Sequence, residues 1–369
     1  MFLFKAIIFF VSGIIEVMKK ATLYEKLKNK RVKCLACAHY CQIMPGRTGI
    51  CGVRLNKDGE LYLLVYGKAA AVNVDPIEKK PLFHFLPGTE IFSIGTVGCN
   101  FGCDFCQNWD LSQSSKIVQQ KIKDPKEKIL KLGKLVEYGQ DLPPEKIVKY
   151  CLERKIPSLA YTYNEPVIFF EYIYDTAKLA HAQGIKNVFV SNGYESQEAM
   201  QEIHPYLDAI NIDLKSFSER FYQKTCKAHL EPVLKNIKRA YEMKIWLEVT
   251  TLVVPGENDS NKELESIAKF IAGVSKGIPW HVTAFHPEYK MNDKPATPAE
   301  SLQKAYKIGK KAGLKYIYTG NVFDLEHQST YCPKCGQLLI GRDWHTITES
   351  NIVNSKCPKC GMKIEGVWN

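Results

Sequence analysis

The stretch "IFSIGTVGCNFGCDFCQNW", residues 91–109, joins a β-branched and aromatic run to three closely spaced cysteines. The run 91–97 predicts a strand, and Cys99, Cys103 and Cys106 follow it on one short loop. Three thiolates can hold three irons of a cubane iron–sulfur cluster, which usually takes four cysteines. The fourth iron would then keep an open coordination position for a substrate or a cofactor, as the metal of a catalytic zinc site does.

The other residues of this loop fit the same interpretation. Gly102 lets the loop wrap tightly, and Phe101 and Phe105 can shield a cluster from water. The alternative is a structural zinc site completed by a distant ligand. Zinc knuckles favour C-x2-C pairs over C-x3-C-x2-C, which speaks against that alternative.

Six more β-branched or aromatic runs follow and alternate with longer amphipathic stretches. The expected strands are 158–164, 186–192, 208–215, 245–254, 280–285 and 316–321. Strand and helix in alternation give parallel β/α units. We therefore expect an α/β fold, a full or partial (β/α) barrel with its active site at the C-terminal ends of the strands. The Lys-rich stretch 116–140 is expected to be an insertion or a mobile lid.

Polar side chains stand at the ends of these strands, where a barrel would bring them to one mouth. After the three cysteines they are Asn164, Glu165, Ser191, Asn192, Asp213, Lys215, Glu248, Thr250, His286 and Asn321. Such residues are also ordinary helix caps and turn formers. Alternation along a strand puts Asp213 and Lys215 on one face, as functional groups or as an ion pair at the rim. His286, before Pro287, is expected to be a turn residue.

The chain has 369 residues, 13 cysteines and a formal net charge of +11. Cysteine pairs of the C-x2-C type in a long chain indicate metal ligands and a reducing compartment, so we expect a cytoplasmic protein. Cys151 and Cys226 stand alone and are expected to be buried apolar residues. The positive charge leaves a zinc-bearing nucleic-acid-binding module as a remote alternative, but basic and acidic residues are interspersed and no basic stripe is present.

Two further cysteine clusters flank the barrel region. Cys332, Cys335, Cys357 and Cys360 form C-x2-C-x21-C-x2-C, which predicts a structural zinc ribbon, with rubredoxin-like iron as the minor alternative. The N-terminal cluster consists of Cys34, Cys37, Cys41 and Cys51. It could bind structural zinc, which we favour, or an auxiliary iron–sulfur cluster, and His39 could replace one cysteine.

The domain organisation follows from these clusters. We expect a Cys-rich N-terminal module at 18–85, a β/α barrel at 86–325 and a zinc-ribbon-like module at 326–369. Residues 1–17 contain an apolar run that is too short to span a membrane. We expect them to be an extension before an alternative start at Met18, with a peripheral membrane anchor as the alternative.

The Cys loop resembles the signature of the radical S-adenosylmethionine superfamily. The phrases "VGCNFGCDFCQNW", "AYTYNEP", "VSNGY", "INIDLK" and "VDPIEKKPLFHFLPG" resemble the pyruvate formate-lyase activating enzyme branch, and most closely the radical protein of the AmmeMemoRadiSam system. This resemblance implies a [4Fe-4S] cluster on Cys99, Cys103 and Cys106 whose open iron chelates S-adenosylmethionine. Reductive cleavage would give methionine and a 5′-deoxyadenosyl radical that abstracts hydrogen from an unknown substrate.

The resemblance also implies roles for strand-end residues. Glu165 would meet the methionine amino group, although Tyr163 and Asn164 replace the two glycines of the usual G-G-E-P phrase. Ser191 and Asn192 would approach the carboxylate or ribose. The resemblance further implies that Asp213 and Lys215 lie near ribose and substrate.

The expected partners follow from the same resemblance. They are a small-molecule substrate or a partner protein, an electron donor such as a flavodoxin or ferredoxin, and AMMECR- or Memo-type proteins. Activation of a glycyl radical enzyme is the alternative function. No transmembrane span and no specific nucleic acid are expected.

Overall fold

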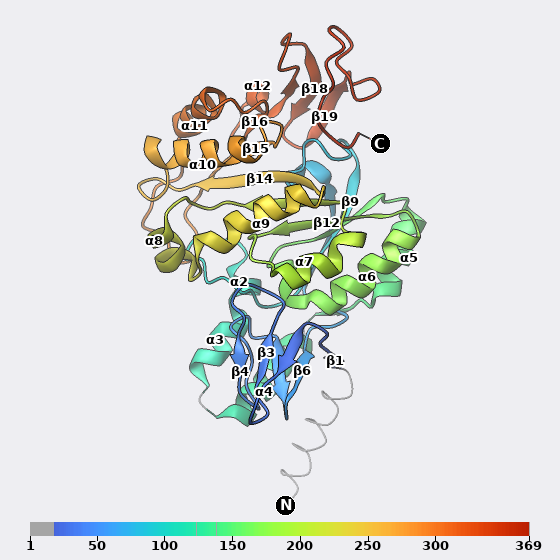
Figure 1. Ribbon diagram of the computed structural model, residues 1–369, viewed down its shortest axis with the longest axis vertical. Coiled ribbons are helices and arrows are strands. Elements are labelled where there is room, and N and C mark those ends of the chain that lie inside the picture. Colours follow the sequence, from blue (N-terminus) through green and yellow to red (C-terminus); the bar gives the residue numbers. More distant parts are fainter. Residues whose placement is uncertain (1–17, 123, 138, 369) are drawn as a thin grey trace, which may run out of the picture.

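The centre of the molecule is an eight-stranded sheet. The computed structural model describes residues 18–122, 124–137 and 139–368 (Figure 1). The strands are β8 (Ala71–Pro76), β9 (Glu90–Gly95), β11 (Ser158–Tyr161), β12 (Lys186–Ser191), β13 (Ala209–Asp213), β14 (Trp246–Val253), β15 (Trp280–Ala284) and β16 (Ile317–Gly320). Their order is β16-β15-β14-β13-β12-β11-β9-β8, with β16 and β8 at the two edges. All neighbours pair in parallel except β8, which runs antiparallel to β9. The sheet is thus a partial (β/α) barrel, which confirms the expected fold class.

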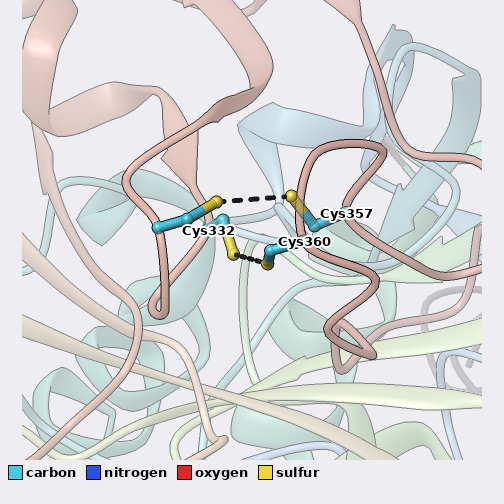
Figure 2. A group of neighbouring side chains, drawn as sticks. Cys332, Cys357 and Cys360 are labelled. Carbon is cyan, nitrogen blue, oxygen red and sulfur yellow. Dashed lines mark hydrogen bonds between the residues drawn. The ribbon is translucent and has the colours of Figure 1, made fainter.

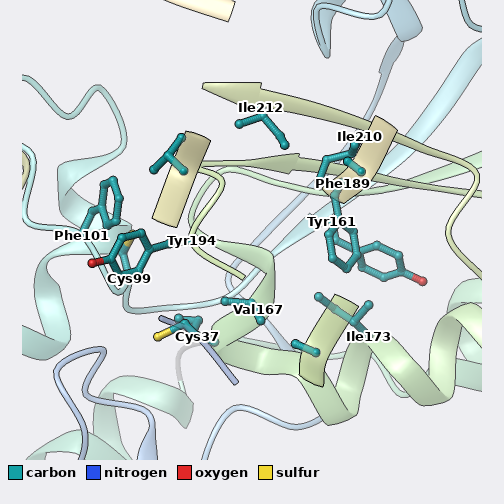
Figure 3. Packing of buried hydrophobic residues seen from close by; sticks show 14 of the residues in the cluster. Cys37, Cys99, Phe101, Tyr161, Val167, Ile173, Phe189, Tyr194, Ile210 and Ile212 are labelled. Carbon is teal, nitrogen blue, oxygen red and sulfur yellow. The ribbon is translucent and has the colours of Figure 1, made fainter. Parts of the chain in front are cut away.

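Helices connect the parallel strands and cover the sheet. They are α5 (Pro144–Arg154), α6 (Phe170–Ala182), α7 (Gln197–Ile203), α9 (Leu230–Glu242), α10 (Asn261–Val274) and α11 (Ala299–Lys311). Shorter turns in the same region are η1 (Ile77–Lys79), η2 (Pro166–Phe169), η3 (His204–Tyr206), α8 (Glu219–Phe221), the π-turn η4 (Tyr222–Cys226) and α12 (Leu325–Gln328). Figure 3 shows the resulting core, in which Tyr161, Phe189 and Ile210 from three neighbouring strands lie together with Ile173 of α6. Burial of this apolar surface holds the helices on the sheet.

One strand of the sheet was not expected from the sequence. All seven strands with β-branched or aromatic runs are present, but β8 is an additional edge strand. It ends at Pro76. Proline has no amide hydrogen to donate to a neighbouring strand, and it is therefore tolerated at the edge of a sheet. β8 lies before residue 85, where we placed the end of the N-terminal module, so the barrel takes its first strand from that module's expected range.

The Lys-rich stretch 116–140, expected to be an insertion or a mobile lid, contains helices with buried residues. It forms α3 (Ser114–Lys121) and α4 (Pro125–Glu137), which follow the short α2 (Trp109–Ser112). Leu132 and Val136 of α4 are buried, and Ser115 of α3 donates a hydrogen bond to the carbonyl of Cys51 at 2.9 Å. Lys121, Lys131 and Lys134 are exposed, as on the outer faces of packed amphipathic helices.

The N-terminal module, residues 18–65, contains two three-stranded sheets. The strands are β1 (Lys19–Lys20), β2 (Tyr24–Lys26), β3 (Val32–Cys34), β4 (Gln42–Ile43), β5 (Arg54–Lys57) and β6 (Glu60–Leu63). A small ladder of β7 (Lys68–Ala69) and β10 (Gln140–Asp141) follows it. Arg54 of β5 donates two hydrogen bonds to the Glu171 carboxylate of α6, at 2.7 and 2.9 Å, and both side chains are buried. This pair fixes the module to the barrel. Our expectation for residues 1–17 lies outside the described residues.

The C-terminal module, residues 329–368, packs against the barrel around Phe83. Its strands are β17 (Thr330–Tyr331), β18 (Leu338–Asp343) and β19 (Thr346–Ser350). The buried Arg342 guanidinium lies 4.2 Å from the Phe83 ring centre and donates a hydrogen bond to the Phe83 carbonyl at 2.7 Å. Near it, His84 joins Tyr318 of β16 to the carbonyl of Glu365. Within the described ranges no helix combines the length and the apolar character needed to cross a membrane.

Candidate active site

The Cys loop, residues 99–106, follows β9 and lies at the C-terminal ends of the parallel strands. The Gly102 amide donates to the Cys226 carbonyl at 2.9 Å, and the Asp104 amide donates to the Thr225 carbonyl at 3.0 Å. Both carbonyls belong to η4, so this π-turn holds the middle of the loop. The backbone contacts leave the cysteine side chains free to face the barrel mouth.

The three thiols of the loop are shielded from solvent. Cys99 and Cys103 are buried and Cys106 is half-buried, with its sulfur 3.1 Å from the Ser112 hydroxyl. Burial raises the pKa of Cys99 and of Cys106, while a hydrogen bond with the Cys226 thiol and burial raise the pKa of Cys103. Buried thiolates need a bound cation to be stable, so this group of thiols suits a metal cluster. Cys226 and Cys151 are fully buried, as expected.

Most of the strand-end residues line one cavity with these thiols. The cavity has a volume of about 530 Å³. Its lining includes Cys99, Cys103, Cys106, Asn164, Ser191, Asn192, Asp213, Lys215, Thr250 and Asn321. The parallel register of β9, β11, β12, β13 and β14 brings these positions together because the carboxyl ends of parallel strands meet at one edge.

Asp213 and Lys215 form an ion pair within this cavity. The Lys215 ammonium lies 2.7 Å from an Asp213 carboxylate oxygen. Burial alone would lower the pKa of Lys215, but the neighbouring Asp213 carboxylate raises it, so Lys215 stays protonated. The ammonium also lies 5.7 Å from the centre of the Phe105 ring. The pair therefore offers a fixed positive and a fixed negative group beside the Cys loop.

Glu165 lies outside the lining of the cavity. Its carboxylate accepts hydrogen bonds from the Asn192 amide at 2.8 Å and from the Ser191 hydroxyl at 3.1 Å, and it caps η2 through the Val167 amide. Burial and the nearby Glu195 raise the pKa of Glu165. In this arrangement the carboxylate supports the backbone at the end of β12, and Ser191 and Asn192 face the cavity.

Two other strand-end candidates also lie away from the cavity. Glu248 is fully buried and accepts hydrogen bonds from the amides of Phe83 and His84, at 3.0 and 2.8 Å, close to the C-terminal module. It stands near the start of β14 rather than at its end, which explains the difference. His286 contacts Gln107 at 3.0 Å on the exposed side of the loop.

The sequence did not predict one wall of the cavity. This wall comes from β8 and η1 and carries Asn73, Asp75, Lys79 and Lys80. Asp75 pairs with Lys79 at 3.0 Å and with Lys80 at 2.7 Å. These residues belong to the phrase "VDPIEKKPLFHFLPG", which precedes the first expected strand. Only the antiparallel pairing of β8 with β9 brings them to the mouth of the barrel.

The four C-terminal thiols converge on one point (Figure 2). The sulfurs of Cys332, Cys335, Cys357 and Cys360 all lie within 4.8 Å of one another. The pairs Cys332–Cys360 and Cys335–Cys357 are each 3.6 Å apart. A zinc ion bound about 2.3 Å from each of four sulfurs would hold them at about this spacing. The arrangement thus fits a single tetrahedral metal ion.

The four N-terminal thiols line a second cavity, of about 10 Å³. Cys34, Cys37 and Cys51 are buried and Cys41 is half-buried. His39 also lines this cavity, but its Nε2 contacts the carbonyl of Asn100 at 3.1 Å. The cluster therefore lies directly beside the Cys loop.

Comparison with known proteins places the chain in a family. The model of the radical SAM superfamily matches residues 93–271, which run from the end of β9 through the Cys loop and include β11 to β14. The chain is 41% identical, over 354 residues, to the uncharacterized protein MJ0808 of Methanocaldococcus jannaschii; the match covers 94% of this chain and 99% of that protein. The chain belongs to the radical SAM superfamily and is a radical SAM enzyme. Membership implies S-adenosylmethionine and a [4Fe-4S] cluster as cofactors.

Two more relatives concern the activating enzymes. The (2S)-3-sulfopropanediol dehydratase activating enzyme of Klebsiella oxytoca is 24% identical over 147 residues, which are 40% of this chain and 46% of that enzyme. This supports the branch of the superfamily that contains the activating enzymes. A solved domain of pyruvate-formate lyase-activating enzyme from Bacteroides vulgatus has 23% identity and a TM-score of 0.40, over 44% of this chain and 98% of that domain.

Proposed function

We propose that Cys99, Cys103 and Cys106 hold the [4Fe-4S] cluster and that S-adenosylmethionine binds beside it in the cavity of about 530 Å³. One observation carries this proposal: the three thiols and the polar strand-end side chains line the same cavity. A cluster with three protein ligands supplies, when S-adenosylmethionine is bound, an electron that cleaves it to methionine and a 5′-deoxyadenosyl radical.

The chain's own residues would position the cofactor and exclude water. Asn192 and Ser191 face the cavity and suit the methionine carboxylate or the ribose, with Glu165 holding their backbone in place. Asp213 and Lys215 suit the ribose and the substrate, because one accepts hydrogen bonds and the other donates them. Phe105 is buried against the cluster side and keeps that side of the loop dry.

The wall formed by β8 and η1 supports a small-molecule or partner-assisted reaction. Asp75, Lys79 and Lys80 give the cavity a charged boundary of its own, and they suit a polar substrate of limited size. The second candidate is activation of a glycyl radical enzyme, which the partial similarity to the Klebsiella oxytoca activating enzyme favours. Either reaction needs a low-potential electron donor such as a flavodoxin or ferredoxin.

The C-terminal thiols would hold a structural zinc ion, because their sulfurs are spaced for one tetrahedral metal. AMMECR- or Memo-type proteins are proposed as partners, and the thiol content suits the reducing conditions of the cytoplasm.

The test is an anaerobic assay of the reconstituted and reduced protein with S-adenosylmethionine. We expect 5′-deoxyadenosine from the wild type and from Cys151→Ala, which removes a buried thiol of α5 far from the loop. Cys103→Ala should lose the cleavage activity and about four irons per chain. Full activity in Cys103→Ala would contradict the site, and a glycyl radical signal on added pyruvate formate-lyase would favour the second candidate.

A further inference from the structure

The wall formed by β8 and η1 differs in charge from the rest of the cavity. Apart from the thiols, the charged side chains that line the cavity are Asp75, Lys79, Lys80, Asp213 and Lys215. Asp213 and Lys215 neutralise each other through their contact at 2.7 Å. The wall holds the remaining two lysines and only one aspartate. Among the described residues that line the cavity, no carboxylate is left to neutralise the second lysine of the wall.

The two lysines of the wall share one carboxylate. The Lys80 ammonium lies 2.7 Å from one oxygen of Asp75, and the Lys79 ammonium lies 3.0 Å from the other. The side chain of Lys80 is only 5% exposed, whereas that of Lys79 is 51% exposed. Burial lowers the pKa of Lys80, and the hydrogen bond with Asp75 acts in the opposite direction. Since a buried ammonium group needs a counter-charge, an anionic ligand would complete the pairing of these lysines.

Tyr163 holds this arrangement in place and also lines the cavity. Its φ of +70° lies in the left-handed region, which is unfavourable for a bulky side chain. Its hydroxyl accepts a hydrogen bond from the Asn73 amide at 2.9 Å and donates one to Asp75 at 3.3 Å. The Lys80 ammonium lies 5.0 Å from the centre of its ring. Backbone strain of this kind is concentrated at ligand-binding sites, so it supports a binding role for the wall.

Two other lysines stand beside the Cys loop. Lys116 donates a hydrogen bond to the Phe101 carbonyl, and the Lys215 ammonium lies 5.7 Å from the Phe105 ring centre. These cations suit the negative charge that three thiolates bring to a cluster. Lys79 and Lys80 belong to η1 and to the residue that follows it, and their contacts are with Asp75 of β8. The positive charge of the wall therefore suits a different ligand.

We infer that the wall formed by β8 and η1 binds one carboxylate or phosphate group of a small substrate, with Lys79 and Lys80 donating hydrogen bonds to its oxygens. Ammonium groups pair with either kind of oxygen anion. The inference rests on the proposed function for the reaction at this site, but not for the binding of the anion. A substrate of this class argues against activation of a glycyl radical enzyme, because a backbone glycine carries no charge.

The first test is isothermal titration of the full chain with inorganic phosphate and, separately, with acetate. We expect a Kd of about 1 mM for at least one of them, and the tighter one distinguishes a phosphate site from a carboxylate site. Lys79→Met leaves Asp75 paired with Lys80 and should raise this Kd about tenfold, the loss of one charge-assisted hydrogen bond. Lys269→Met removes an exposed lysine of α10 and is the matched control, because it changes the net charge equally but should keep the wild-type Kd.

The second test uses the sign of the charge change. Asp75→Asn removes the carboxylate that competes with the ligand and should lower the Kd about threefold. Weaker anion binding in Asp75→Asn would show that the carboxylate only supports the fold, and would overturn the inference. Because Lys79 is half exposed, Lys79→Met should fold even if Asp75→Asn does not. An unchanged Kd in Lys79→Met would then overturn the inference by itself.

The outcomes separate this inference from the proposed function. Formation of 5′-deoxyadenosine by a wild-type protein that binds neither anion would overturn the subsite and leave the proposed function intact. Anion binding that Lys79→Met weakens, in a protein that forms no 5′-deoxyadenosine, would support the subsite and contradict the proposed function. Anion binding that Lys215→Met weakens and Lys79→Met does not would place the anion at the Asp213–Lys215 pair and overturn the inference.

Discussion

Asp213 and Lys215 are the two charged strand-end residues that the sequence predicted and that line the cavity with the Cys loop. They form an ion pair at 2.7 Å, so neutralising the Asp213 carboxylate would leave the Lys215 ammonium without its counter-charge. We expect Asp213→Asn to keep the cluster spectrum and to lower the rate of 5′-deoxyadenosine formation about 10- to 100-fold, the loss of one charge-assisted hydrogen bond. Asp293→Asn changes an exposed carboxylate and is the control. An unchanged rate in Asp213→Asn would remove this residue from the site.

His84 predicts a pH dependence of stability. Burial lowers its pKa to about 4, although the Glu248 carboxylate and the Glu365 carbonyl act in the opposite direction and Arg342 and His281 add to the lowering. The unfolded chain takes up a proton near pH 6.5 and the folded chain does so only near pH 4. The free energy of unfolding should therefore fall by about 3 kcal/mol as the pH drops through this window, and the contribution is constant above it.

The measurement for His84 is denaturant unfolding between pH 4 and pH 7. In His84→Asn the slope of stability against pH should decrease by about one proton. His204→Gln, at an exposed histidine, should keep the wild-type slope. Equal slopes in His84→Asn and the wild type would contradict the lowered pKa.

At the scale of elements, the contact between β5 of the N-terminal module and α6 of the barrel depends on the buried ion pair of Arg54 and Glu171. Glu171→Ala leaves the Arg54 charge buried without its partner, which should lower the free energy of unfolding by about 3–5 kcal/mol. The double variant Arg54→Met/Glu171→Leu should recover much of this loss, because no buried charge remains. Glu153→Ala on the exposed face of α5 should change stability by less than about 0.5 kcal/mol. A loss in Glu171→Ala as small as this control would show that the pair does not hold the joint.

The elements that the sequence predicted share a simple local signal. The seven parallel strands have β-branched or aromatic runs, and the polar residues at their ends reach the mouth because the barrel aligns those ends. β8 lacks such a run, and its residues Asp75 and Lys80 enter the cavity through a pairing that only the folded sheet reveals. The prediction that Glu248 lies at the mouth was wrong for a related reason. The sequence indicated the strand, but which of its residues lies at the mouth depends on the register of the sheet.

At the scale of the whole molecule, the C-terminal module packs against the barrel around Phe83. Cys335→Ala should remove the zinc and lower the melting temperature by about 5 °C or more, because metal binding contributes directly to the folding of such modules. Lys334→Ala, at an exposed neighbour in the same turn, is the control. Retention of zinc and of the melting temperature in Cys335→Ala would contradict the structural role of these thiols.

The sequence did not predict the contacts between modules. Arg342 and Phe83 are 259 positions apart, and nothing in either local pattern points to the other. The same holds for the contact between His39 and the Asn100 carbonyl, which brings the N-terminal cysteines beside the Cys loop. Cysteine patterns predicted that metal modules exist, and only the fold shows which of them lies beside the active site.

The Arg54–Glu171 joint also has a consequence for how the protein is made. A ribosome adds about 5–20 residues per second, so the 117 residues between the two partners take about 6–23 s to synthesise. Cys37 pairs through its backbone with Glu195, which emerges later still. The N-terminal module thus waits for partners from the middle of the chain, and during that interval its thiols are open to whatever metal carrier meets the nascent chain.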